Sequence, residues 1–156
     1  MGHIFLQNRI RKGKASLLQL LATRQWLAAC VVAGSVLEAL LYLALSRERG
    51  ETFKQARMRA AIVFKGGITQ RSHLRSFHLP EFAQTAHMLG LLGEKTVDAV
   101  CTVHNYRCYL HANRVYSEGK DCTEDMALFS ASVVQLVERD LRTEPRPTEQ
   151  YALAAA

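Results

Sequence analysis

The feature that most constrains this chain is a 20-residue apolar run from Trp26 to Leu45, which carries a single charge at Glu38. A run of this length is long enough to span a bilayer as a helix. A charge in the middle of such a span costs roughly 2.5–3.5 kcal/mol even on the most lenient insertion scale, and arginines flank both ends of the run. We therefore expect the run to be the buried central helix of a soluble bundle, with a membrane span as the alternative.

The rest of the chain is typical of helices separated by short breaks. With 156 residues, of which 49% are hydrophobic, the chain can bury one core without disulfides. No segment alternates cleanly between apolar and polar residues, so strands are not expected. The fold class predicted is all-α, an antiparallel bundle of four to five helices. The expected helices cover residues 15–46, 52–65, 80–91, 94–111 and 121–141.

Glycine, proline and acidic residues mark the expected helix boundaries. Gly66 and Gly93 end or break helices, and Pro80 fits a first helical turn. Asp121 followed by Glu124 suggests a capping box for the last helix. We divide the chain into three parts: a basic N-terminal segment (1–14), the helical bundle (15–142) and a flexible C-terminal tail (143–156).

The cysteines and the absence of common motifs exclude several classes of protein. The four cysteines form no C-x-x-C pair, so neither a structural zinc site nor any other metal site is expected. The sequence contains no phosphate-binding glycine loop, dinucleotide fingerprint or H-E-x-x-H element, so no cofactor is expected. No cleavable signal sequence is evident, and we expect reduced thiols in the cytoplasm. The formal net charge of +6 is compatible with an RNA, DNA or acidic protein partner.

The segment 94–111 carries the residues of greatest chemical interest. At 100° per residue, His104, Arg107 and His111 share an arc of roughly 60° on one face of a helix. Arginine binds phosphate with a two-pronged fork, and histidine transfers protons near neutral pH. The cluster therefore suits RNA cleavage. From the spacing alone, the favoured interpretation is structural, with Arg107 paired to a buried carboxylate and His111 hydrogen-bonded to a backbone carbonyl. On the same segment we expect Tyr106 in the core and Tyr109 at the rim.

Three segments carry a family resemblance. Val32–Leu43 reads VAGSVLEALLYL, His78–Leu92 reads HLPEFAQTAHMLGLL, and Val103–Gly119 reads VHNYRCYLHANRVYSEG. In this order they resemble the HEPN superfamily, in particular its bacterial branch of small helical proteins of uncharacterised function. Members of this branch show G-S-x-x-E-x-L in the first helix and an L-R-D-Y-R-N-L-I-H-P-like element closing the penultimate long helix. The resemblance covers about residues 30–141.

The HEPN resemblance implies an antiparallel helical bundle, usually a homodimer, and in many members a metal-independent endoribonuclease. Such proteins act in toxin–antitoxin, antiviral defence and RNA-processing systems. By position, the catalytic arginine would be Arg107, the catalytic histidine His111 and the first-helix acid Glu38, which we expect to face Arg107. The candidate binding residues are His104, Cys108, Tyr109 and Arg114.

The sequence departs from the catalytic HEPN pattern at three points. Cys108 stands where the family usually has a polar residue, only three residues separate Arg107 from His111, and Ala112 replaces a frequent proline. The sequence therefore leaves open whether the chain is an enzyme. The alternatives are a non-catalytic interaction subunit that binds an antitoxin or another complex partner, and a small membrane-anchored protein.

Overall fold

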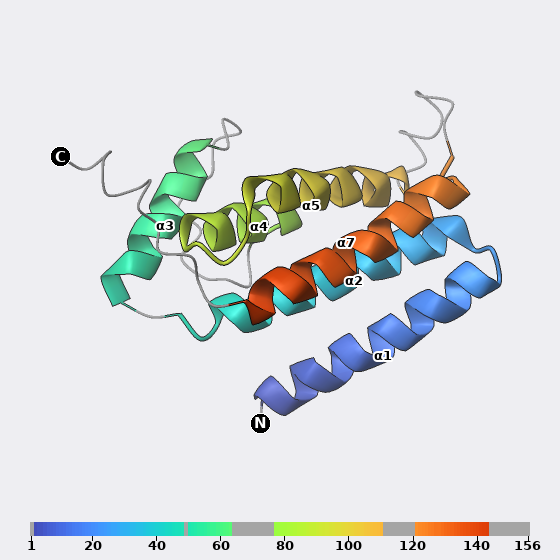
Figure 1. Ribbon diagram of the computed structural model, residues 1–156, viewed down its shortest axis with the longest axis horizontal. Helices are drawn as coiled ribbons and strands as arrows, with labels where there is room; N and C mark the ends of the chain where they lie inside the picture. The colour runs from blue at the N-terminus through green and yellow to red at the C-terminus, as the bar shows by residue number, and fades with distance from the viewer. Residues whose placement is uncertain (1, 49, 64–76, 111–120, 144–156) are drawn as a thin grey trace.

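The computed structural model describes residues 2–48, 50–63, 77–110 and 121–143 (Figure 1). In these residues the secondary structure is entirely helical, which confirms the all-α prediction. The elements are α1 (Gly2–Ala22), α2 (Trp26–Leu45), α3 (Gly50–Val63), α4 (Leu79–Met88), α5 (Glu94–Arg107), the 3-10 helix η2 (Cys108–Leu110) and α7 (Glu124–Arg142).

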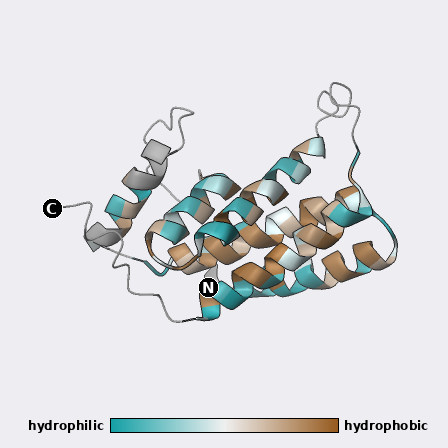
Figure 2. Cartoon of the chain, turned by 45° about the horizontal axis from the view of Figure 1, so that its top comes forward, coloured by the Kyte–Doolittle hydropathy of each residue, from teal (hydrophilic) through white to brown (hydrophobic). Residues whose placement is uncertain are grey.

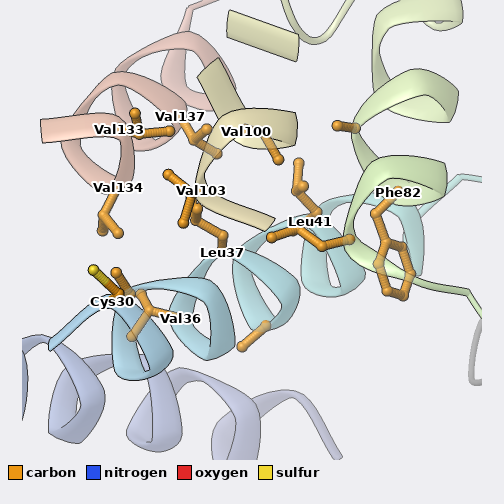
Figure 3. Close-up of a cluster of buried hydrophobic side chains, with 14 of the residues drawn as sticks. Cys30, Val36, Leu37, Leu41, Phe82, Val100, Val103, Val133, Val134 and Val137 are labelled. Carbon is orange, nitrogen blue, oxygen red and sulfur yellow. The ribbon is translucent and has the colours of Figure 1, made fainter. Parts of the chain in front are cut away.

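The apolar helix α2 lies at the centre of the packing. It contacts α1 on one side, α7 on the next, and α4 and α5 on the others (Figure 1). Figure 3 shows Leu37 of α2 beside Val103 of α5, Leu41 toward Phe82 of α4, and Val134 of α7 above Cys30 of α2. By length and composition alone α2 could also cross a membrane, but packing between four helices accounts for the same apolar pattern.

The hydrophobic residues of the chain follow this packing. Figure 2 shows the hydrophobic colour concentrated where the helices lie against one another, with hydrophilic residues toward their outer faces. Nine residues of α2 are buried. On α7 the buried residues recur at helical spacing, at Ala127, Ser130, Val134 and Val137. A stripe of this kind buries one face of a helix against a core.

The single helix expected over residues 15–46 is wrong, because two helices meet at a turn over residues 23–25. Arg24 there adopts a left-handed conformation with φ of 57°. The backbone N–H of Gln25 donates to the carbonyl of Leu20 at 2.9 Å, which ends α1. The first helix begins at Gly2, so the boundary that we placed between residues 14 and 15 falls inside α1.

The helix starts were predicted with mixed success. At α4, the carboxylate of Glu81 accepts from the backbone N–H of His78 at 2.6 Å, and Pro80 lies in the first turn as expected. At α7, the capping box expected from Asp121 is wrong. The N-cap is Thr123, whose hydroxyl accepts from the backbone N–H of Met126 at 3.3 Å. The expected C-terminal tail lies almost wholly outside the described residues.

Leu37 and Leu18 provide a matched test of this core. The side chain of Leu37 is fully buried, whereas 66% of Leu18 is exposed. We expect Leu37→Ala to lower the free energy of unfolding by about 2–5 kcal/mol, because the cavity left behind cannot fully collapse. Leu18→Ala should change it by less than about 0.5 kcal/mol. Urea denaturation followed by circular dichroism measures both, and equal losses would contradict the placement of α2.

Candidate functional site

An ion pair between Arg107 and Glu38 forms the centre of the candidate site. Arg107 is the last residue of α5, Glu38 lies in the middle of α2, and Nη1 of the arginine donates to Oε1 of the carboxylate. The expectation that Glu38 faces Arg107 is therefore confirmed. The two residues are 69 positions apart in the sequence, so only the docking of α5 on α2 brings them together.

Gly34 gives the arginine side chain room to reach the carboxylate. It lies one turn before Glu38 on α2, and a methyl group at this position would lie 3.0 Å from Cδ of Arg107. Such a distance is too short for a relaxed carbon–carbon contact. The stem of Arg107 therefore crosses α2 directly over Gly34, which gives the glycine a steric role.

The Arg107–Glu38 pair is only partly shielded from solvent. The side chains retain 31% and 33% of their exposure, respectively. A guanidinium carries five N–H donors in a planar fork, so one carboxylate partner leaves donors for a ligand. The pair is therefore not the buried pair, worth about 3–5 kcal/mol, that a purely structural role of Arg107 would predict. A partly exposed pair of this kind contributes about 1 kcal/mol or less.

His104 and Cys108 lie beside Arg107 at the end of α5. The Nε2 atom of His104 is 3.9 Å from Sγ of Cys108, which begins η2. Both side chains are partly buried. His104 lies three residues before Arg107 and so shares its face of the helix. Of the expected imidazoles, this is the one that the described residues place near Arg107.

The two tyrosines near Arg107 occupy the reverse of their expected positions. Tyr109 is buried, with 7% of its surface exposed, whereas Tyr106 is partly exposed. The ring of Tyr106 packs edge-on against Phe129 of α7, with centroids 6.0 Å apart. The change from α-helix to 3-10 helix at Cys108 alters the rotation per residue, so α-helical periodicity misplaces Tyr109, which follows the change. Tyr106 precedes the change and packs at the edge of the core.

Two of the candidate residues fall outside the part of the chain that the structure describes. These are His111, the expected catalytic histidine, and Arg114. The site as described therefore consists of an arginine held by a carboxylate, with an imidazole and a thiol on the same helix end. A guanidinium held in this way suits the recognition of an anion, and His104 lies one helical turn before it.

Cys30, Cys122 and Ser130 form a buried cluster that the sequence analysis did not predict. All four cysteines carry free thiols. Burial raises the pKa of Cys122 to about 12, with the neighbouring Cys30 adding to the shift. The hydroxyl of Ser130 donates to Sγ of Cys30 at 3.8 Å. No spacing in the sequence could reveal this cluster, because its members come from distant positions.

Among the described residues, no three histidine, cysteine or acidic side chains gather as metal ligands.

Comparison with known proteins gives no match to a family model, a curated protein or a solved structure. Interpretation of the site therefore rests on its own residues.

A double-mutant cycle measures the strength of the central pair. We expect Glu38→Gln, Arg107→Gln and the double variant to give a coupling energy of about 0.2–1 kcal/mol, because solvent screens a pair that is one-third exposed. The pair of Lys14 and Glu138, at 2.7 Å and also partly exposed, is a matched control cycle. A coupling energy of about 3 kcal/mol for Glu38–Arg107 in urea denaturation would show instead that the pair is effectively buried.

The raised pKa of Cys122 predicts that the folded protein loses stability at alkaline pH. The unfolded thiol titrates near its ordinary pKa of 9.0, whereas the folded thiol keeps its proton until about pH 12. Above pH 9.0 the folded state therefore binds more protons than the unfolded state, so stability falls as the pH rises toward 12. Urea denaturation at pH 8 and pH 10 should show this decline, and Cys122→Ala should reduce it. An identical pH dependence in both proteins would contradict the assignment.

Proposed function

We propose that this chain is a HEPN-like, cytoplasmic RNA-binding protein that acts as a homodimer and contacts RNA phosphate through Arg107. The observation that carries this proposal is the guanidinium of Arg107, which Glu38 holds across Gly34 while about a third of the side chain stays exposed. A held guanidinium loses less conformational entropy on binding than a free one. The net charge of +6 favours a polyanionic ligand over a neutral one.

RNA cleavage without metal is the stronger form of this proposal. An imidazole would take the proton of the 2′-hydroxyl, the 2′-oxygen would attack phosphorus, and the departing 5′-oxygen would receive a proton. Arg107 would stabilise the charge that develops on the phosphoryl oxygens. The resemblance gives the proton-transfer role to His111, and His104 is the imidazole on the same face of α5.

The homodimer contact, which the HEPN resemblance implies, would include the face of α2 that carries Glu38. Val31, Ser35 and Tyr42 are partly exposed there, and helical periodicity places them on the side of α2 that carries Glu38. A second copy on this side would bring the two Arg107 sites close to one another, as the HEPN resemblance implies.

A second candidate function is a non-catalytic subunit of a defence or regulatory complex. The observation that favours it is the ion pair itself, because Glu38 offsets the charge that Arg107 could offer to phosphate. In this alternative the pair fixes the register of α5 on α2. The protein would then act through a partner, such as an antitoxin, and would turn over no RNA.

RNA binding and cleavage assays test the proposal. Purified protein is incubated with labelled single-stranded RNA, tRNA and total RNA in the presence of EDTA. We expect Arg107→Ala to weaken RNA binding by about tenfold to a hundredfold, the effect of losing a hydrogen bond to a charged group. Gly34→Ala should also weaken binding, because the added methyl displaces the stem of Arg107 while keeping its charge.

Arg139→Ala is the matched control, since it removes an arginine that is 73% exposed at the far end of α7. It should leave RNA binding nearly unchanged. Cleavage by the wild type that is lost in Arg107→Ala and His111→Ala would establish the ribonuclease. Binding without cleavage would restrict the protein to RNA recognition. Absence of RNA binding at low salt, with the protein folded, would overturn the proposal in favour of the second candidate.

A further inference from the structure

A groove with an aliphatic floor and a cationic rim lies between α1, α2 and α7. Its volume is about 460 Å³. The three helices around it lie along the same side of the molecule in Figure 1. The floor consists of the side chains of Ile10, Leu40, Leu43 and Leu141, and the rim carries Arg11, Lys14, Arg47, Glu138 and Arg142.

The charges of the rim leave a strong positive excess. Lys14 donates to both carboxylate oxygens of Glu138, at 2.7 and 2.9 Å, so this carboxylate is already neutralised. In the described parts of the chain no carboxylate pairs with Arg11, Arg47 or Arg142. The rim therefore presents three arginines around an apolar surface, a combination that suits a partner with both acidic and apolar groups.

The groove is separate from the Arg107 site. Glu38 and Leu43 are five residues apart on α2, and at 100° per residue they point about 140° apart. Leu40 lies about 160° from Glu38 by the same measure. A ligand at Arg107 would therefore not reach the groove without wrapping around α2, and the groove needs a ligand of its own.

We infer that this groove docks an acidic amphipathic helix of a partner protein. Apolar side chains at positions i, i+3 and i+4 of such a helix would enter the aliphatic floor. Its flanking glutamates or aspartates would pair with Arg11 on one rim and with Arg47 and Arg142 on the other. Charge complementarity of this kind selects an acidic partner and speeds its association.

The groove fits an acidic helix better than RNA or a second copy of the chain. None of its lining residues is aromatic, so it offers no platform on which a base could stack. RNA phosphates bound at the rim would also leave the aliphatic floor exposed to water, because RNA has no apolar side chains to cover it. A second copy would bring its own net charge of +6 to a cationic rim.

A designed peptide tests the docking site directly. The probe is a fluorescein-labelled helical peptide with leucine at i, i+3, i+4 and i+7 and glutamate at the flanking positions. We expect wild type to bind it in a fluorescence anisotropy titration, and a peptide with lysine in place of each glutamate not to bind. The double variant Arg47→Glu/Arg142→Glu should weaken binding of the acidic peptide by at least about tenfold, the effect of losing one good charge pair.

The matched control is Arg9→Glu/Lys12→Glu, which makes the same change in charge on the other flank of α1. It should leave the affinity for the peptide within about threefold of wild type, since neither residue lines the groove. An equal loss in both double variants, or no binding by wild type, would overturn the inference. So would loss of single-stranded RNA binding in Arg47→Glu/Arg142→Glu with no effect on the peptide. Because Arg107→Ala leaves the groove intact, failure of RNA binding and failure of peptide docking are distinguishable.

Discussion

The packing of α2 against four other helices is the constraint on which both the fold and the site depend. α2 supplies the central part of the core, and its buried residues run along most of its length. The one charge in this helix, Glu38, is tolerated because α5 delivers Arg107 to it and because the pair stays at the edge of the core. The position of Arg107 in turn depends on Gly34. The recognition chemistry is thus a product of helix packing.

The candidate site combines the guanidinium of Arg107, held by Glu38, with the side chains of His104 and Cys108. Arg107 is oriented, His104 lies on the same helix end, and Cys108 is the nearest thiol. A held guanidinium suits the recognition of an anion, whereas acid–base chemistry needs an imidazole in hydrogen-bond reach of the reacting atoms. The groove on the other side of α2 has a different character, since its floor is aliphatic. The two proposed binding surfaces on this small bundle therefore differ in chemistry.

The helices were predictable from the sequence because apolar periodicity and breaks at glycine and proline both mark them. The turn over residues 23–25 could not be predicted, because Arg24 adopts a left-handed φ of 57° at a position where the sequence has no glycine. The facing of Glu38 and Arg107 was anticipated only through the HEPN resemblance, since no local pattern joins them. The burial of Tyr109 follows from a 3-10 turn that helical periodicity does not show. The groove could not be predicted from the sequence, because its lining residues come from α1, α7 and the C-terminal part of α2 and its flank.

The central place of α2 also has a consequence for biosynthesis. Translation proceeds from the N-terminus, so α2 emerges from the ribosome before α4, α5 and α7, which cover most of its sides. During that interval a long apolar segment is exposed with Glu38 lacking Arg107, and it offers the same pattern that targeting factors and chaperones recognise. Helix α1 precedes it and can shield one side at once. The order of helices along the chain therefore sets how long the nascent protein is open to aggregation or misdirection to a membrane.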